Sequence, residues 1–487
     1  MGTCTQSTLP TQIVLLGATG DLAKKKLIRS LFDLHVRGTL PRHLHIVAFS
    51  RNELTSESYR SFAREHLGPS AQHHQDSVEP FLALFEYVSG TFDDAAAFVR
   101  IKDHLNAYDE TIGMCTSKLF YLAVPPSFYD VIFERIAHAK LDLPCAEGEG
   151  WVRILVEKPF GSDLDHAHRL EDKLSVLFKE EQIYRIDHYL AKDALQNILS
   201  FRYSNVLFED RFNSDHVEAV YLRVFESFDV STRGAFFDGV GALRDVGQNH
   251  MLQMLALIAM EHPETLSPND LRTARAKVLK ALEPPTQGDI GTQIIKGQYD
   301  TYRETEHVDP TSKTETYFML KTAVDTPRWR GVPFYLEHGK AMPESSSEIV
   351  VRFRSAKHCV CGEREPHDHP NFLRFTISPE QTISVRFWVR APGTAYTLES
   401  NDLVFDRAHT STQNGVSISD AYEEVLLNAI CGDQTLFVSS AEQAAAWTHI
   451  TRILELWQDT TPLTYTHGSD GPSSALQQEV QALFPNA

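Results

Sequence analysis

Residues 13–31 read IVLLGATGDLAKKKLIRSL, and this stretch decides the fold of the N-terminal part of the chain. An apolar run leads into Gly17 and Gly20, and an amphipathic helical pattern follows. Glycines at a strand-to-helix turn let the backbone approach a pyrophosphate, which the first N–H groups of the helix then bind. The spacing is G-x-x-G-x-x-A, with Ala23 at the position of a third glycine. A structural turn without a ligand is the competing interpretation of such a pattern.

Further apolar runs follow this opening unit, with helical patterns between them. They are HIVAFS (45–50), KLFYLAVP (118–125) and VRILVEKPF (152–160). Continuous apolar strands separated by amphipathic helices are typical of a parallel sheet that is covered on both faces. We therefore expect an α/β domain over residues 11–187, built as a doubly wound, Rossmann-like parallel sheet.

The pattern changes after residue 187. Strands such as HVEAVYLRVFES (216–227), EIVVRF (348–353) and TISVRFWVR (382–390) follow without a helical segment between each pair. Such a pattern favours a mixed or antiparallel sheet with helices on one side. We expect a larger α+β domain over residues 188–487, with the boundary near residues 187–200.

The end of the second predicted strand, FSRNE (49–53), bears on the type of dinucleotide. An acidic residue at this tip would hold an unmodified ribose, whereas Arg51 can bind a 2′-phosphate. We therefore expect NADP as the cofactor. NAD remains an alternative, because Glu53 lies two residues away.

Composition and charge exclude several classes of partner. The chain has 487 residues, with 46 Lys and Arg against 65 Asp and Glu, so its net charge is −19. We expect no nucleic-acid or membrane partner, and an anionic ligand then requires a locally basic pocket. The N-terminus shows no secretory or lipidation signal, and six cysteines are few for this length. We expect a cytoplasmic protein with free thiols.

Polar residues crowd the stretch YRIDHYLAKD (184–193). His188 and Lys192 are four residues apart and would share one face of a helix, beside Tyr189. Together with a helix N-terminus, this face suits a phosphate dianion. A solvated helix face is the competing interpretation. Lys158 ends the strand in ILVEKPFG and is expected at the ligand crevice, because the carboxyl ends of the strands border it.

A strongly apolar helical pattern contains the stretch LRDVGQNHMLQML (243–255). Asp245 is expected to cap this helix, and His250 lies within it. A buried histidine with a carboxylate partner is a good general base, because imidazole titrates near neutral pH. A hydrogen-bonded core histidine is the competing interpretation. Asp187 is the candidate partner, whereas Asp245 falls on the wrong face of an α-helix and is expected to hold substrate.

These motifs together resemble the glucose-6-phosphate dehydrogenase family. GATGDLAKKKL, EKPFG, RIDHYLAKD, LRDVGQNHMLQML, VPFYLEHGKAM and DAYEEVLLNAICGDQTLFV occur in the order of the family, over nearly the whole chain. The resemblance implies oxidation of glucose 6-phosphate to 6-phospho-D-glucono-1,5-lactone with hydride transfer to NADP. This is the first step of the oxidative pentose phosphate pathway. Residues 11–187 would bind NADP, and residues 188–487 would bind the substrate and form the oligomer.

The resemblance also implies roles for single residues. His250 would take the proton of the C1 hydroxyl group, and Asp187 would orient this histidine. His188, Tyr189 and Lys192 would hold the phosphate group of the substrate.

Two further sets of residues would surround the sugar and the cofactor. The sugar contacts that the resemblance implies are Glu226, Asp245 and Lys340, with Lys158 between sugar and cofactor. The cofactor contacts that it implies are Gly17, Thr19, Gly20, Asp21, Leu22, Arg51, Tyr129 and Lys158.

The chain departs from the family pattern at several positions. Ser345 in GKAMPESSSE stands where many members have Lys or Arg. Arg390 in WVRAPG stands where many members have a glutamine before a proline. Glu337 lies in a segment that is basic in members with a second, structural NADP, so we expect that second site to be absent.

The insertion KHCVCGEREPHDHPNF (357–372) combines C-x-C with H-x-H. Its residues Cys359, Cys361, His367 and His369 could complete a tetrahedral zinc site that staples a loop. A polar hairpin loop is the interpretation that we adopt, so no metal is expected.

Quaternary structure and two alternative functions remain open at this point. The large sheet expected in the second domain predicts a homodimer or homotetramer. One alternative function is an NAD(P)-linked dehydrogenase of another sugar or sugar phosphate. The other is a non-catalytic NADP-binding regulator, against which the presence of both Asp187 and His250 speaks.

Overall fold

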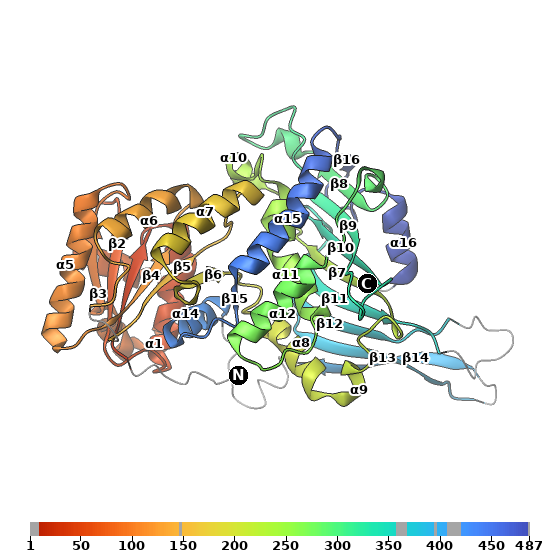
Figure 1. Ribbon diagram of the computed structural model, residues 1–487, viewed down its shortest axis with the longest axis horizontal. Helices are drawn as coiled ribbons and strands as arrows, with labels where there is room; N and C mark the ends of the chain where they lie inside the picture. Colours follow the sequence, from red (N-terminus) through yellow and green to blue (C-terminus); the bar gives the residue numbers. More distant parts are fainter. Residues whose placement is uncertain (1–8, 146–148, 357–367, 394–396, 407–419, 486–487) are drawn as a thin grey trace. The chain divides into compact units, whose positions relative to one another are not determined.

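The structure is a computed structural model, which describes residues 9–145, 149–356, 368–393, 397–406 and 420–485. The chain folds into two compact units (Figure 1). The first unit comprises Met1–Ala191, Thr265–Arg272 and Ser419–Gln443, and the second comprises Lys192–Glu264, Thr273–Ile418 and Ala444–Ala487. The two later segments of the first unit were not expected, because hydrophobic periodicity does not show which sheet a segment joins.

The first unit contains a seven-stranded sheet with the order β15-β6-β5-β4-β1-β2-β3. Strands β1 to β6 are parallel and have the order of a doubly wound, Rossmann-like sheet, which confirms the predicted α/β fold. Strand β15 comes from the C-terminal part of the chain and pairs antiparallel with β6. The strands are β1 (Thr11–Leu16), β2 (Leu44–Ser50), β3 (Phe85–Ser89), β4 (Ser117–Leu122), β5 (Val152–Val156), β6 (Ile183–Ile186) and β15 (Phe437–Val438).

Helices cover both faces of this first sheet (Figure 1). They include η1 (Ala23–Leu27), α1 (Ile28–Val36), α2 (Ser56–Arg64), α3 (Ser70–His73), α4 (Gln75–Leu82), α5 (Ala95–Ile112), η2 (Pro126–Phe128), α6 (Tyr129–His138), α7 (Leu164–Leu177), η3 (Glu180–Gln182) and α14 (Ala421–Cys431). Ile13 and Leu15 of β1 pack with α1, α4 and α14, whereas Val14 and Leu16 pack with α5, α6 and α7. Burial on both faces explains why β1 reads as a continuous apolar run.

The second unit contains a nine-stranded sheet with the order β14-β13-β12-β11-β7-β10-β9-β8-β16. β7 and β10 are parallel neighbours, as are β8 and β16, and the other pairs are antiparallel. The predicted mixed sheet is therefore confirmed. The strands are β7 (Val217–Phe225), β8 (Ile294–Tyr299), β9 (Tyr317–Ala323), β10 (Pro333–Gly339), β11 (Ser346–Phe353), β12 (Phe372–Ser378), β13 (Thr382–Arg390), β14 (Leu398–Asp406) and β16 (Leu463–Tyr465).

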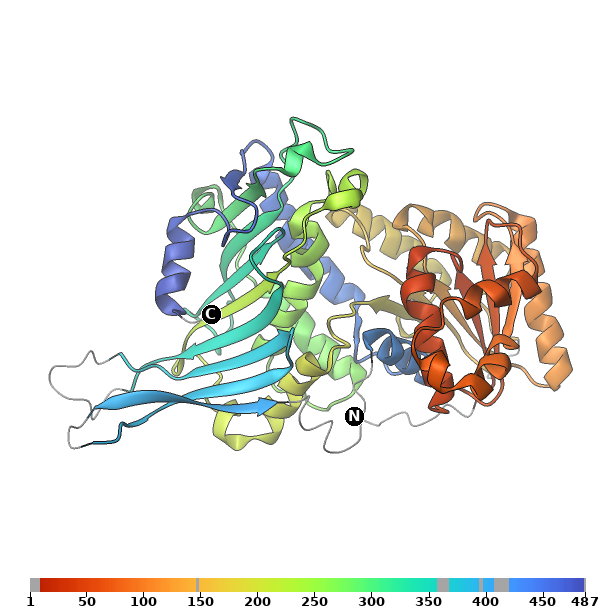
Figure 2. The same cartoon turned by 180° about the vertical axis from the view of Figure 1, so that it is seen from behind.

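Helices of the second unit gather on one face of its sheet, as predicted, and α16 lies on the other face (Figure 1, Figure 2). At the end of α16, Phe484 contacts the rings of Tyr221 and Tyr335. The helices are α8 (Asp193–Ser204), α9 (Val206–Glu209), η4 (Ser231–Arg233), α10 (Gly234–Phe237), η5 (Leu243–Met251), α11 (Leu252–Ala259), η6 (Gln287–Asp289), η7 (Tyr302–Glu304), α16 (Ala475–Leu483) and most of α12 (Pro268–Lys280) and α15 (Ser440–Trp457). Among the described residues, no helix combines the length and apolar character that crossing a bilayer requires.

Cys115 and Cys145 form a disulfide, with their Cα atoms 6.0 Å apart. No cysteine among the described residues is free, so the expectation of free thiols was wrong for them. The pairing follows from topology, because Cys115 precedes β4 and Cys145 precedes β5, and parallel neighbours begin at the same edge of a sheet. The sequence did not reveal it, since 30 residues separate the two cysteines and only the fold brings them together.

Candidate active site

A cavity of about 850 Å³ lies at the carboxyl ends of the strands in the first unit. Its walls come from the segments that follow β1, β2, β3 and β4. In doubly wound sheets, ligands bind in the crevice at this edge. The volume is in the range of sites for organic ligands and cofactors. Four of the predicted cofactor residues line the cavity, namely Gly17, Thr19, Gly20 and Arg51.

The turn after β1 has the geometry that its glycines predict. Gly17 has a φ of +87°, and its N–H donates to the carbonyl oxygen of Phe49 at 2.9 Å. A Cβ atom on Gly17 would lie 2.9 Å from Cγ1 of Val124 and would clash with the carbonyl oxygen of Ala123. Only glycine therefore allows this close approach of two strand ends. The N–H of Gly20 closes the turn on the oxygen of Gly17, and the backbone cradle at the helix start fits a pyrophosphate.

Two cations border this cavity. Arg51 follows β2 and is exposed, and Lys24 lies in η1 on the other side of the glycine turn. The hydroxyl of Thr19 donates to Oδ1 of Asn52 at 3.1 Å and lies 3.0 Å from Oγ of Ser50, which ties the segment after β2 to the turn. The two cations fit the phosphates of NADP. Lys24 was not predicted, because the three consecutive lysines gave no indication of which one faces the cavity.

The remaining predicted cofactor residues lie outside the cavity lining. Asp21 and Leu22 are at the start of the helix after the glycine turn, and Asp21 is exposed. Tyr129 is fully buried, and its hydroxyl donates to the backbone oxygen of Glu157 at 2.7 Å. The neighbouring Phe128 lines the cavity instead. This contact indicates that Tyr129 holds the end of β5 in place.

Lys158 and Asp187 follow the neighbouring strands β5 and β6. Val156 lies opposite Arg185 in this parallel pair, so continuing the register places Lys158 opposite Asp187. Asp187 is buried, and Lys158 is half-buried. Burial also raises the pKa of the neighbouring Glu157 carboxyl group to about 7. The first unit thus brings a lysine and two carboxyl groups to the edge of the sheet where the cavity lies.

The stretch after Asp187 is a turn, so the expected helical face of His188 and Lys192 was wrong. The carboxylate of Asp187 accepts the N–H of Tyr189 at 3.0 Å, and the backbone oxygen of Asp187 accepts the N–H of Leu190. A side chain that binds the backbone two residues on competes with helix formation. His188 and Tyr189 therefore lie in the turn, and Lys192 is the N-cap residue of α8.

Three predicted sugar-binding residues converge in the second unit. Glu226 follows β7 and Lys340 follows β10, and these parallel strands end side by side because Gly339 lies opposite Phe225. Lys340 is 3% exposed. Its ammonium group forms an ion pair with Glu226 and another, at 3.5 Å, with Asp245. A buried cation between two carboxylates holds all three side chains in place and presents several acceptor oxygens.

Asp245 and His250 lie on the same helical segment, η5, and two expectations about it were wrong. The helix begins before Asp245, and the carboxylate of Glu315 accepts the N–H of Leu243 at its start, at 3.1 Å. Asp245 is therefore not the cap. η5 is also a π-helix, in which i→i+5 hydrogen bonds bring residues five apart to nearly the same face. The wrong-face prediction failed because it assumed α-helical spacing.

His338, which was not predicted either, is fully buried beside this cluster. It lies in β10 two residues before Lys340, and its Nδ1 donates to the carbonyl oxygen of Val224 at 2.6 Å. Burial lowers the pKa of His338 to about 4, so the ring is neutral and adds no second cation beside Lys340. The stretch EHGK contained the residue, but a histidine inside a strand carries no local signal of burial.

Ser345, one of the departures from the family pattern, lies close to the Glu226 corner. Its hydroxyl oxygen accepts the N–H of Ser227 at 2.8 Å, and the two serine hydroxyl groups are 2.9 Å apart. The backbone N–H of Glu226 donates to Gly339 at 2.9 Å. Ser345 therefore braces the residue that follows Glu226. Arg390 is exposed at the end of β13 and donates to the carbonyl oxygen of Gly393 at 3.0 Å.

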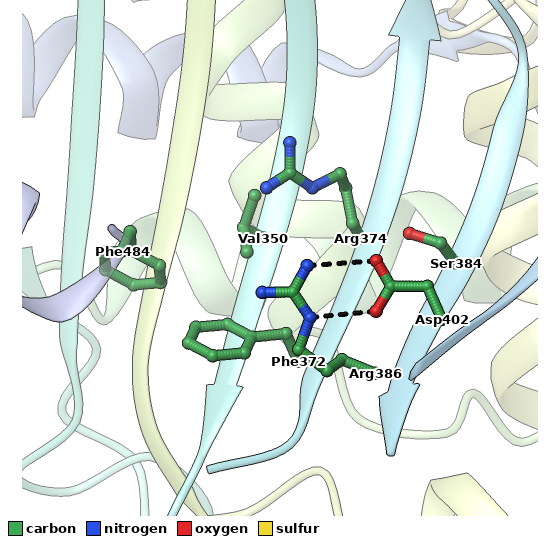
Figure 3. A pocket seen from close by; sticks show the side chains of 7 residues that line it. All are labelled: Val350, Phe372, Arg374, Ser384, Arg386, Asp402 and Phe484. Atoms are coloured by element: carbon green, nitrogen blue, oxygen red, sulfur yellow. Dashed lines mark hydrogen bonds and ion pairs between the residues drawn. The ribbon is translucent and has the colours of Figure 1, made fainter. Parts of the chain in front are cut away.

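Arg374 and Arg386 line a small hollow on the second sheet (Figure 3). Arg386 binds both oxygens of Asp402, at 2.8 and 3.0 Å, and Arg374 binds Glu348 at 2.9 Å. The hollow measures about 20 Å³, which is room for about one water molecule. Glu337 is buried in the same sheet and accepts hydrogen bonds from two tyrosine hydroxyls. The absence of a second NADP site stays a prediction.

The alternative zinc site falls mainly outside the described residues, which do not include Cys359, Cys361 and His367. His369 is described, and its ring meets Trp388 edge-on at 4.4 Å. Within the described part of the chain, no cluster of His, Cys, Asp and Glu is arranged to hold a metal ion. The expectation of no metal stays a prediction.

Two family descriptions match the chain along almost its full length. Residues 14–197 match "Glucose-6-phosphate dehydrogenase, NAD binding domain". Residues 199–481 match "Glucose-6-phosphate dehydrogenase, C-terminal domain". The glucose-6-phosphate 1-dehydrogenase of Chlamydia pneumoniae is 34% identical over 487 residues, which cover 96% of this chain and 94% of the relative. That of Aggregatibacter actinomycetemcomitans is 36% identical over 474 residues, which cover 95% and 94%.

Solved structures agree with this match. A glucose-6-phosphate dehydrogenase in complex with its substrate glucose 6-phosphate has a TM-score of 0.89 at 30% identity, covering 99% of this chain and 98% of that one. The glucose-6-phosphate 1-dehydrogenase of Mycobacterium avium has a TM-score of 0.82 at 29% identity, covering 98% and 97%. Both units are thus matched in sequence and in structure, and the chain belongs to the glucose-6-phosphate dehydrogenase family.

Proposed function

We propose that the protein oxidises glucose 6-phosphate to 6-phospho-D-glucono-1,5-lactone. The observation that carries this proposal is the buried Lys340 between Glu226 and Asp245, with His250 on the same helix as Asp245. Carboxylates and an ammonium group pair with sugar hydroxyls, and an imidazole can take a proton from one of them. NADP, when bound, supplies the nicotinamide ring that accepts the hydride from C1.

In this proposal His250 takes the proton of the C1 hydroxyl group. Asp187 fixes the tautomer of that imidazole and stabilises the imidazolium that forms, as a buried carboxylate does for a catalytic histidine. Transfer of the proton leaves the electrons of the O–H bond to form the C1 carbonyl group as the hydride departs. His250 is 2% exposed, so water competes little for its ring.

The phosphate group is held, in the same proposal, by His188, Tyr189 and Lys192. These residues offer an imidazole, a hydroxyl and an ammonium group within five positions of the chain. Such donors form charge-assisted hydrogen bonds to phosphate. The turn that Asp187 imposes supports this role, because it fixes the backbone that carries His188 and Tyr189.

We further propose that residues 11–187 bind NADP and that residues 188–487 bind the sugar phosphate. The glycine turn would hold the pyrophosphate, and Arg51 with Lys24 would hold the 2′-phosphate. Lys158 would lie between sugar and cofactor, since it follows β5 at the cavity edge of the sheet.

The appearance of NADPH, followed by its absorbance, tests the reaction. We expect the unmutated protein to reduce NADP with glucose 6-phosphate and not with free glucose, and His250→Asn to lose about a thousandfold in kcat. His43→Asn, a change at an exposed histidine before β2, is the matched control and should keep full activity. No NADPH from the unmutated protein would contradict the proposal, and equal rates with free glucose would contradict the phosphate grip.

A cytoplasmic location is also a proposal. Two Arabidopsis thaliana relatives, 35% and 36% identical, are named as cytoplasmic enzymes. The Cys115–Cys145 disulfide argues in the other direction, because disulfides are rare in reducing compartments. Cell fractionation with an antibody to the chain decides between the two, and a signal only in an oxidising compartment would reject the cytoplasm.

A homodimer or homotetramer is supported by the hairpin of β13 and β14. The strand register places four exposed apolar side chains on one face of this hairpin. They are Phe387 (40% exposed), Val389 (41%), Leu403 (67%) and Phe405 (47%). Monomers rarely leave such a patch in water. Light scattering on the eluted protein measures the mass of the particle. We expect Leu403→Glu to shift this mass to that of one chain, and a monomer before mutation would contradict the proposal.

A further inference from the structure

A second cavity, of about 530 Å³, lies wholly within the second unit. Its walls come from residues 283–294, from β9, from the turn before β10 and from α15. Among the described residues, none that the proposed function uses lines this cavity. Its volume is that of a site for a small organic molecule.

One accessible polar side chain in the wall of this cavity has no hydrogen-bond partner within the described part of the chain. His449 of α15 is 7% exposed, and burial alone lowers the pKa of its ring to about 4, so the ring is neutral. A neutral imidazole has one donor and one acceptor nitrogen, and no described residue forms a hydrogen bond with either of them. The hydroxyl oxygen of Thr322 in β9 also lacks a partner in the described part of the chain, but it has almost no accessible surface, so a ligand in the cavity does not reach it. Buried polar groups are nearly always hydrogen-bonded, so the ring of His449 points to a ligand in the cavity.

The charges around the cavity select the type of ligand. Glu283 is exposed at its rim, and Asp289 is a second carboxylate in the lining. The ammonium group of Lys321, which also contributes to the lining, is bound to Glu479 at 2.8 Å. Anions such as sugar phosphates and nucleotides are therefore disfavoured. The apolar part of the wall includes Pro284, Pro285, Val332 and Ile453.

We propose that this cavity binds a small amphipathic amino alcohol. The hydroxyl group of the ligand bonds to His449, its apolar body lies against the prolines, and its ammonium group lies near Glu283. Such a ligand is opposite in charge to glucose 6-phosphate and NADP. Because the lining residues take no part in the proposed function, the site is independent of the proposed active site and does not rest on the proposed function.

Three probes with one ring and one hydroxyl group separate these contributions. They are trans-4-aminocyclohexanol, trans-4-methylcyclohexanol and trans-4-hydroxycyclohexanecarboxylate. Saturation-transfer NMR titrations of the full chain measure the dissociation constant of each probe. We expect the amine to bind up to about fivefold more tightly than the methyl compound, because its partner Glu283 is exposed, and we expect the carboxylate to bind most weakly.

Two variants test the named contacts. Glu283→Gln should bring the amine to the affinity of the methyl compound, whereas Glu264→Gln, a change at an exposed glutamate outside the cavity, should leave their ratio unchanged. His449→Leu should weaken all three probes by about tenfold, as expected for lost hydrogen bonds. If His449→Leu does not fold, the comparison of the two glutamate variants decides alone. Equal affinity of amine and carboxylate, an unchanged ratio in Glu283→Gln, or no saturable binding of any probe would overturn the proposal.

Discussion

The hydroxyl of Tyr121 donates a hydrogen bond of 2.6 Å to the carboxyl group of Glu157, which is buried after β5. Burial is the largest effect on this group and raises its pKa from 4.5 to about 7, although Tyr121 and Lys158 act in the opposite direction. Between these two values the folded protein keeps the proton and the unfolded chain releases it. The free energy of unfolding therefore falls as the pH rises from about 4.5 to about 7, and then stays constant.

Glu157→Gln should remove this fall in the free energy of unfolding. An amide keeps an oxygen that accepts the hydrogen bond of Tyr121, and it carries no charge. We expect the variant to gain on the order of 3 kcal/mol over the unmutated protein at about pH 8 and almost nothing at about pH 4.5. Urea unfolding at the two pH values measures the gain. Glu110→Gln, at an exposed position, should show no such dependence, and an equal gain at both pH values would contradict the raised pKa.

Arg51→Ala should change the choice of cofactor. Arg51 borders the cavity after β2, where a 2′-phosphate requires a cation and a 2′-hydroxyl does not. A charge-assisted hydrogen bond contributes about 1.5–3 kcal/mol, so we expect the KM for NADP to rise about 10- to 100-fold while the KM for NAD changes little. Initial rates with both cofactors measure this. Arg42→Ala, at an exposed arginine before β2, should change neither value, and equal rises in Arg51→Ala would contradict the assignment.

The parallel sheet of the first unit was predictable because its signals are local. All six residues of β1 are buried, so the strand reads as an apolar run, and the glycines at its end mark the turn. Strand β15 has only two residues and pairs with β6 some 250 positions earlier. No local pattern specifies such a pairing. The same holds for the disulfide, whose two cysteines are brought together only by the return of the chain to the same sheet edge.

The candidate site was less predictable wherever the backbone leaves regular structure. The side chain of Asp187 binds the backbone of Tyr189 and replaces an expected helix with a turn. A π-helix brings Asp245 and His250 to nearly one face, although α-helical spacing separates them. Hydrophobic periodicity reports burial and not the hydrogen-bond pattern, so both features stayed hidden.

Lys192→Ala and Asp187→Asn should separate binding from chemistry. Lys192 is proposed to hold the phosphate, so its loss should raise the KM for glucose 6-phosphate about tenfold with little change in kcat. Asp187 is proposed to act as the proton moves, so Asp187→Asn should lower kcat by about a hundredfold or more with a smaller effect on KM. Steady-state kinetics measure both values, and Lys280→Ala at the end of α12 is the control. The reverse division of effects would reject the two roles.

Cys115→Ser should destabilise the first unit without affecting catalysis. The disulfide closes a loop of 30 residues, and a chain-entropy estimate gives about 3–4 kcal/mol for its removal. The bond lies where β4 and β5 begin, whereas the cavity lies where the strands end, so kcat should be unchanged. Urea unfolding measures the loss, and peptide mass spectrometry without reductant identifies the bond. Alkylation of both cysteines in the unreduced protein would show that the bond is not formed.

Gly17→Ala should weaken NADP binding far more than a second glycine substitution of similar backbone conformation. Gly17 and Gly38 have φ angles of +87° and +67°, so alanine strains the backbone at both, by about 1 kcal/mol. At Gly38 no atom of the described residues lies within 4 Å of an added Cβ, whereas at Gly17 the Cβ meets Ala123 and Val124. Relief of this clash displaces the glycine turn, which lines the cavity. Calorimetric titration with NADP should therefore show at least a tenfold loss of affinity for Gly17→Ala and none for Gly38→Ala. Equal effects of the two changes would contradict this prediction. They would mean that only the φ angle requires glycine at position 17, and that the ends of β1 and β4 lie farther apart than in the structure.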